Sequence, residues 1–298
     1  MSPSTSRRIM PAALVAALLL SPAPASALSS GSMGAGGHGR YVPPLTNPVF
    51  NETPYITTEV RPIYLHQEIP GAFLTGGGTI DLFALQLRLA LSDSVGLIAT
   101  KDGYADIDFE VMLPDENGFA NIAAGLKIAL LSDPETDTIV SAGARYEVPL
   151  GDLESGGVEL QGHGDGMIDV FVTGATTLDK LGVQGSVGTN IAVDSGENTS
   201  MLHYAAHVDY ELVPGLFPIV ELNGFTPIDD GDKLAVNFEG FDIVNFGSSD
   251  ASTVITGAAG ARFRLGEQAL VGVAYELPLT TREDLLEWRV TTDIVFYR

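Results

Sequence analysis

Four ionisable residues in the second half of the chain have the spacing of one strand face: His203, His207, Asp209 and Glu211. Side chains alternate between the two faces of a strand, so these odd-numbered residues point the same way. A histidine that a carboxylate orients can act as a general base, which makes a hydrolase using His203, His207 and Asp209 one hypothesis. The sequence offers no persuasive nucleophile to partner them. We therefore expect these side chains to pair with Arg262 or Arg264 of a neighbouring strand, and we expect no enzyme.

Charged residues also occupy the polar faces of other alternating segments. Together with the four above, they give the side chains that we expect inside a closed structure: Glu59, Arg61, Arg88, Lys127, Arg145, Glu147, His203, His207, Asp209, Glu211, Arg262, Arg264, Glu276 and Arg289. Facing lipid would cost an Arg or Lys about 2–4 kcal/mol at the bilayer midplane. Two interpretations remain open, a polar pore that filters solutes by charge and a packed network of salt bridges. We favour the pore.

The connections hold further acidic residues. One connection, 102–118, contains six of them: Asp102, Asp106, Asp108, Glu110, Asp115 and Glu116. Hard cations prefer such oxygen-rich segments, but the spacing does not match a helix-loop-helix calcium site. We expect a solvated loop, no bound metal and no cofactor.

The elements that position these residues are strands. From Tyr55 onward, apolar and polar residues alternate; in one segment Val183, Gly185 and Val187 oppose Gln184 and Ser186. Such alternation is typical of a strand with two different environments. The pattern predicts twelve strands, at about 55–69, 79–92, 95–101, 119–132, 137–150, 167–178, 181–194, 200–213, 216–224, 252–265, 268–279 and 284–298.

The connections between these strands are alternately tiny and mostly long. Asp179-Lys180 and Pro214-Gly215 are examples of the first kind, and 102–118, 151–166 and 225–251 of the second. Short turns on the periplasmic side and long loops outside are typical of outer-membrane barrels. We therefore predict an all-β, antiparallel, up-and-down transmembrane β-barrel of about twelve strands over 55–298. Ten or fourteen strands remain alternatives, because alternation continues through 105–113 and 157–166 could also extend a strand.

The first 54 residues do not alternate. Residues 1–27 combine Arg7 and Arg8, an apolar stretch and the small residues Ala25-Ser26-Ala27, which predicts a cleaved signal peptide. Residues 28–54 are rich in Gly, Ser and Pro, and we expect a flexible periplasmic segment there.

Composition limits the partners. The net charge is −23, and it becomes −25 without the predicted signal peptide, which carries two arginines and no acids. Such acidity argues against nucleic acid, whose binding depends on cationic contacts to phosphate. The chain has no cysteine, so no disulfide supports the fold.

Two stretches carry resemblances. The last strand, Trp288 to Arg298, alternates and ends close to an aromatic, and so resembles the C-terminal assembly signal of Gram-negative outer-membrane channel proteins. It departs from that signal because Arg298 follows Tyr297. Residues 118–151 are similar to a glycine-marked strand pair in the outer-membrane transporters of the meta-pathway of phenol degradation, with Leu150 in place of a threonine.

These resemblances imply a porin-like channel or transporter in the outer membrane for small solutes, among them hydrophobic or aromatic compounds. The implied partners are outer-membrane lipid and lipopolysaccharide, a small-molecule solute, and the outer-membrane assembly machinery. The alternatives are the hydrolase described above and a non-conducting scaffold or receptor that acts through its acidic loops.

Overall fold

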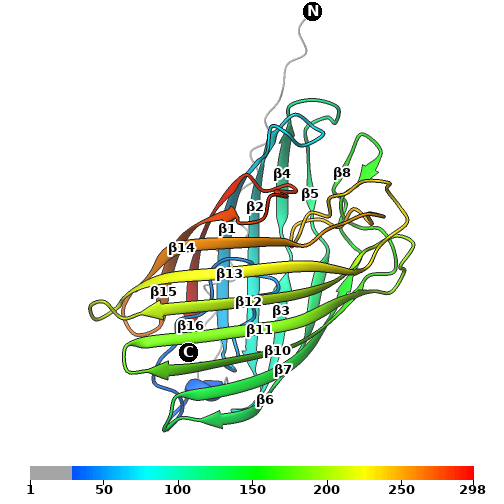
Figure 1. Ribbon diagram of the computed structural model, residues 1–298. Helices are drawn as coiled ribbons and strands as arrows, with labels where there is room; N and C mark the ends of the chain where they lie inside the picture. Colours follow the sequence, from blue (N-terminus) through cyan, green and yellow to red (C-terminus); the bar gives the residue numbers. More distant parts are fainter. Residues whose placement is uncertain (1–28) are drawn as a thin grey trace, which may run out of the picture.

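The computed structural model describes residues 29–298, so the predicted signal peptide lies outside the described part. Its strands form one closed antiparallel wall, because β1 pairs with both β2 and β16 (Figure 1). The elements are η2 (Gly31–Met33), β1 (Glu59–Ile69), β2 (Gly78–Ala90), β3 (Val95–Lys101), β4 (Tyr104–Phe109), β5 (Glu116–Phe119), β6 (Ile122–Asp133), β7 (Thr138–Val148), β8 (Glu154–Ser155), β9 (Val158–Glu159), β10 (Met167–Leu178), β11 (Leu181–Ala192), β12 (Ser200–Tyr210), β13 (Leu216–Asp229), β14 (Val254–Arg264), β15 (Ala269–Pro278) and β16 (Trp288–Tyr297).

The wall has twelve positions, as the alternation predicts. Two of these positions are interrupted strands. β4 continues β3, since β2 pairs with both, and β5 lies beyond the start of β6. The interruption falls at Asp102-Gly103, where Gly103 has a φ of 144°, a backbone conformation that suits glycine. The side chain of Asp102 accepts the Leu85 N–H across the gap at 2.9 Å. Part of the expected loop 102–118 is therefore strand, while 154–159 forms only the small hairpin β8–β9.

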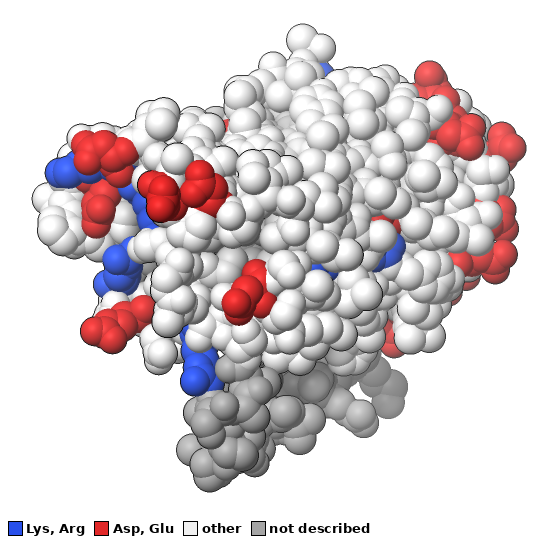
Figure 2. Space-filling view, turned by 90° about the horizontal axis from the view of Figure 1, so that it is seen from below, with Lys and Arg blue, Asp and Glu red and all other residues white. Residues whose placement is uncertain are grey.

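Apolar side chains cover the outside of the wall. Exposed examples are Phe83 in β2, Leu126 in β6, Val170 in β10, Val220 in β13 and Phe296 in β16. Most of the face seen in Figure 2 is uncharged, and its charged groups gather mainly toward the left and right margins, with one acidic group near the centre. Arginine, lysine and carboxylate side chains are instead buried within. This inside-out distribution satisfies both the lipid outside and the hydrogen-bonding groups inside.

The two ends of the barrel differ. Short turns such as 134–137 and 179–180 lie at one end, and the long loops 149–166, 230–253 and 279–287 lie at the other (Figure 1). Among residues 29–298, no helix is long and apolar enough to cross a membrane.

Candidate functional site

The N-terminal segment fills the barrel. Residues 41–57, the lumen segment, are buried apart from the half-buried Val49, although they form no helix or strand. Side chains from strands around the wall bind its backbone: Arg262 of β14 donates to Pro43 O at 2.6 Å, and Gln86 of β2 donates to Pro48 O at 2.7 Å. The structure differs here from the expected flexible segment over 28–54. Buried backbone groups need partners, and the wall side chains supply them.

Glu52 is the principal carboxylate of the lumen segment. Its Oε2 lies 2.5 Å from Nη2 of Arg88, and its Oε1 lies 2.7 Å from Nζ of Lys127. Arg88 also donates to Glu59 at 2.7 Å. All four side chains are buried, so each charge depends on the others for its neutralisation. The network holds the segment to β1, β2 and β6 at once.

A second anchor holds the start of the lumen segment. Glu221 of β13 accepts the N–H groups of Leu45 and Thr46 at 2.8 and 2.7 Å. On the other side, Arg61 and Arg262 share Asp293 of β16, at 2.6 and 2.8 Å. Both arginines also donate to the Pro44 carbonyl. The polar wall residues thus bind the backbone of the lumen segment from several strands.

The structure buries nearly all of the side chains that the sequence places inside. Those that are buried are Glu59, Arg61, Arg88, Lys127, Arg145, Glu147, His203, His207, Asp209, Arg262, Glu276 and Arg289. Glu211 and Arg264 are half-buried near the short turns. Glu211 accepts the Gly215 N–H of its own turn, and the Arg264 guanidinium lies 5.3 Å from the centre of the Phe217 ring.

Pairings not foreseen from the sequence complete the network. Arg145 binds Asp169 of β10, Arg289 lies 3.0 Å from Asp242 in the β13–β14 loop, and Lys101 lies 2.7 Å from Glu147. Glu276 accepts from Thr256 and, at 3.1 Å, from Asn223. Asp169 alternates with the apolar residues Ile168 and Val170, so the strand pattern could have placed its side chain inside the barrel. Glu52 lies in a segment without periodicity and offers no such signal.

The two strand histidines are enclosed by carboxylates. His203 Nε2 lies 2.7 Å from Asp169, and His207 lies 2.7 Å from Glu221 and 3.4 Å from Asp209. Asp209 in turn binds Arg40 from the N-terminal segment rather than Arg262 or Arg264. Within residues 29–298, no hydroxyl is hydrogen-bonded to either ring. These residues therefore brace the wall, and the arrangement does not supply the nucleophile that a hydrolase would need.

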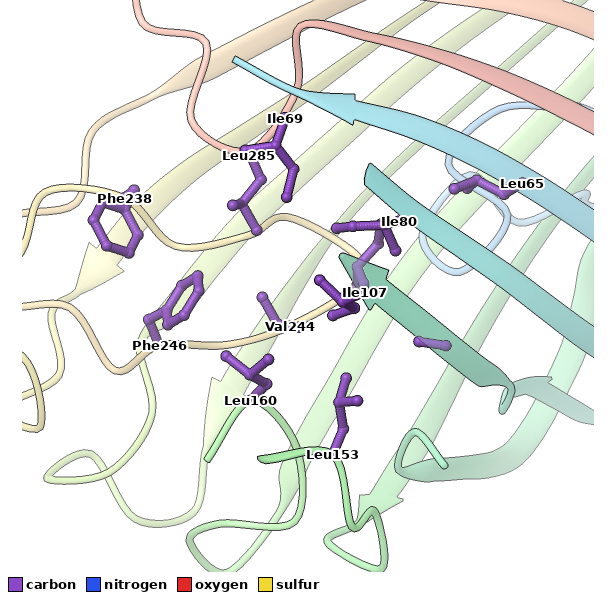
Figure 3. Close-up of a cluster of buried hydrophobic side chains, with 12 residues drawn as sticks. Leu65, Ile69, Ile80, Ile107, Leu153, Leu160, Phe238, Val244, Phe246 and Leu285 are labelled. Carbon is purple, nitrogen blue, oxygen red and sulfur yellow. The ribbon is translucent and has the colours of Figure 1, made fainter. Parts of the chain in front are cut away.

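The long loops close the barrel at the end opposite the short turns. An apolar cluster joins Phe238, Val244 and Phe246 of the β13–β14 loop to Leu285 of the β15–β16 loop and Ile80 of β2 (Figure 3). The side chains in Figure 3 come from both the loops and the wall. This apolar cluster seals the loop end by burial of hydrophobic surface.

Two buried carboxylates hold these loops together. Glu239 accepts the N–H groups of Phe246 and Ser248 at 2.8 and 3.0 Å, and Asp284 accepts the Glu239 N–H at 2.7 Å. Burial raises the pKa of Glu239 to about 7 and the pKa of Asp284 to about 6. Both groups can therefore change charge close to neutral pH.

The wall is hollowed at the strand interruption. An outer groove of about 640 Å³ is lined mainly by apolar side chains, including Phe83, Phe119 and Leu150. A cavity of about 30 Å³ lies against it, lined by Leu65, Gln86 and Ile243. The groove and the cavity share four lining residues: Ile63, Ala84, Asp102 and Ala120. The two spaces therefore adjoin at these residues.

The acidic residues of the expected loop 102–118 do not gather into a metal site. Asp106 and Asp108 are exposed on β4. Across residues 29–298, no group of three or more His, Asp or Glu side chains is arranged to hold a metal ion.

Comparison with known proteins supports the fold. No family model and no curated protein matches the chain. Among solved structures, an outer-membrane channel from Pseudomonas putida F1 has 13% identity and a TM-score of 0.58, covering 87% of this chain and 100% of that one. The NanC porin has 8% identity and a TM-score of 0.51, covering 81% and 99%. The chain is an outer-membrane β-barrel. At these identities the likeness concerns the fold alone, and the resemblance to the phenol-degradation transporters stays a prediction.

Proposed function

We propose that the protein is an outer-membrane channel for small hydrophobic compounds, aromatic ones included, which leave the barrel sideways through the wall. The observation that carries this proposal is the pair of adjoining spaces at Ile63, Ala84, Asp102 and Ala120. One space faces the lumen, and the other opens on the apolar exterior. A solute that crosses here reaches the bilayer without passing the charged lumen.

An apolar path leads from the loops to this point. A pocket of about 490 Å³ at the loop end has an apolar side, formed by Phe73 and Phe238, and a charged side, formed by Arg282, Glu283 and Asp284. Phe238 belongs to the apolar cluster, as does Ile243, which also lines the inner cavity. Apolar side chains therefore continue from the pocket to the wall. The apolar cluster between the pocket and the wall favours solutes without charge.

The axial route is unfavourable for any solute. The lumen segment occupies it, and removing that segment would leave Arg88 and Lys127 without Glu52. Breaking a buried ion pair costs roughly 3–5 kcal/mol. The axial lumen is therefore closed by buried ion pairs that are costly to break.

The wall route is also closed at rest. The inner cavity of about 30 Å³ has the volume of about one water molecule. Transport therefore requires movement of the loop that carries Asp242 and Ile243. Because Arg289 pairs with Asp242, this loop is tied to the wall at the level of the cavity.

The surroundings of the barrel supply its remaining partners. We expect outer-membrane lipid and lipopolysaccharide to contact the apolar exterior, and the outer-membrane assembly machinery to recognise β16. The scaffold or receptor alternative would leave both the groove and the inner cavity without a role.

Uptake of N-phenyl-1-naphthylamine, which fluoresces on reaching the bilayer, tests the proposal in cells whose lipopolysaccharide excludes the dye. Expression of the protein should accelerate the fluorescence rise. Ala84→Trp fills the shared wall and should abolish that acceleration, whereas Ala259→Trp, on the outside of β14, should leave it unchanged. Equal rates with and without the protein would refute the channel, and equal rates for the two variants would refute the wall route.

A further inference from the structure

Another histidine, His38, lies at the short-turn end, away from His203 and His207 of β12. His38 of the N-terminal segment places Nδ1 at 2.9 Å from Oδ1 of Asp137 and Nε2 at 3.0 Å from Oγ of Ser132. The His38 side chain has no exposed surface, whereas Ser132 is exposed. A hydroxyl, an imidazole and a carboxylate are thus joined in the order used by serine hydrolases.

Ser132 owes its position to an irregularity in β6. Along this strand Ala123 and Lys127 are buried, while Leu126 and Ile128 face outward. Simple alternation would send Ser132 outward with the even-numbered residues. The register shift between Ala129 and Leu131 reverses the alternation and turns Ser132 toward the mouth of the barrel, where His38 lies. Bulges that redirect a side chain are common next to active sites.

Asp137 is free to orient His38 because another carboxylate builds the turn. Asp133 accepts the Glu135 N–H at 3.1 Å and the Thr136 hydroxyl at 2.7 Å. Asp137 itself has a φ of 49°, a left-handed conformation. With the turn already closed by Asp133, the side chain of Asp137 meets the imidazole.

Backbone hydrogen bonds and a ring contact hold His38 in place. The backbone N–H of His38 donates to the carbonyl oxygen of Ser32 at 2.8 Å. The backbone N–H of Ser32 donates in turn to the carbonyl oxygen of Ile56 at 2.9 Å. The ring also packs edge-on against Tyr55, with ring centroids 5.3 Å apart. These contacts hold His38 to the lumen segment and leave it little rotational freedom.

We propose that Ser132, His38 and Asp137 form a serine esterase site for carboxylic esters with an apolar acyl chain. Asp137 accepts the Nδ1–H of His38, so Nε2 accepts the Ser132 proton as Oγ attacks the ester carbonyl. The tetrahedral adduct breaks the bond to the alcohol oxygen, and His38 returns the proton to the departing alcohol. Water, deprotonated by His38, then releases the carboxylic acid and restores Ser132.

The surface beside Ser132 indicates the substrate class. Leu130 and Leu131, the two residues before it, are 66% and 52% exposed. They lie at the end of the wall, where the apolar belt meets the aqueous turn. Ser132 faces the mouth of the barrel and Leu131 faces outward, so an acyl chain can lie across the rim of the wall against these leucines while its ester group reaches Ser132. A short water-soluble ester lacks this apolar contact.

A fluorescent fluorophosphonate tests the site on the refolded full-length barrel in detergent. Activated serines displace fluoride and retain the probe. Wild type should be labelled, with labelling lost in Ser132→Ala and in His38→Gln. Ser94→Ala, in the neighbouring β2–β3 turn, is the matched control and should label like wild type. Hydrolysis of p-nitrophenyl decanoate should fall at least 100-fold in the first two variants and exceed that of the acetate ester in wild type.

A thiol version keeps the test valid if a variant folds poorly. Ser132→Cys should react with iodoacetamide at pH 7 at least 10-fold faster than Ser94→Cys, because His38 promotes the thiolate. Adding His38→Gln should remove that advantage. A folded wild type that takes no label, label that persists in His38→Gln, or equal thiol rates would each overturn the proposal. None of these readouts depends on transport.

Discussion

Lys127 Nζ of the barrel wall lies 2.7 Å from Oε1 of Glu52 in the segment that fills the lumen, and neither side chain is exposed to water. The pair joins β6 to the N-terminal segment at a point where Arg88 of β2 also arrives. The polar side chains on the inner face of the wall bind the polar groups of the lumen segment here. The interior of this barrel is therefore a packed network and not the open pore that we favoured from the sequence.

Removing the charge of Glu52 should open the lumen to ions. Glu52→Gln keeps the shape but leaves Lys127 without a carboxylate, which should loosen the segment by about 3–5 kcal/mol. The excess positive charge should make the resulting conductance selective for anions. Single-channel recording in planar bilayers measures both effects. Glu211→Gln, at a turn outside this network, is the control; identical traces for the two variants would contradict the plug.

Transport should accelerate as pH rises from 5 to 8. The pKa of Glu239 is raised to about 7 and that of Asp284 to about 6, both above the values near 4 expected in an unfolded chain. The closed loops are thus stabilised by the neutral acids. That contribution is complete below about pH 4 and is lost as pH climbs through 6 and 7.

Dye uptake as a function of pH checks this dependence. Glu239→Gln fixes a neutral side chain, so the rise near pH 7 should disappear and only the rise near pH 6 from Asp284 should remain. Glu283→Gln, which is exposed, should follow wild type. A wild-type rate of dye uptake that falls with rising pH would contradict the predicted direction of the pH dependence.

Weakening the apolar cluster should loosen the loop that closes the barrel. Phe246→Ala deletes a buried ring that packs against Phe238, with ring centroids 4.9 Å apart, and should cost about 3–5 kcal/mol of local stability. We expect faster proteolytic cutting within 230–253 and faster dye uptake. Leu74→Ala removes a side chain that is already 40% exposed and should change neither. Unaltered cutting of Phe246→Ala would mean that the cluster does not hold the loop.

Strand alternation predicted the wall well, because inside and outside are chemically opposite. Lys127 and Arg262 could be assigned to the interior from their neighbours alone. The same logic placed the strands to within a few residues, apart from the interruption at Asp102-Gly103. There a side chain replaces a ladder hydrogen bond, an exchange that alternation does not encode.

The contents of the barrel were beyond such reasoning. Residues 41–57 have no periodicity, and their prolines and short polar residues look like a free tail. Their order comes largely from carbonyl and N–H groups, which every sequence possesses, and from the wall side chains that bind them. The contact of His38 with Ser132 was hidden for a similar reason: the two are 94 positions apart and meet only because β6 is bulged.

Measuring two fluxes in the same variants tests the separation of the axial lumen from the wall route most directly. Ion conductance and N-phenyl-1-naphthylamine transfer should be compared in wild type, Glu52→Gln, Ala84→Trp and the double variant. We expect Glu52→Gln to raise conductance without slowing the dye, Ala84→Trp to stop the dye without changing conductance, and the double variant to show both effects. Dye transfer that survives Ala84→Trp and rises with conductance in Glu52→Gln would place the solute in the axial lumen and contradict the account.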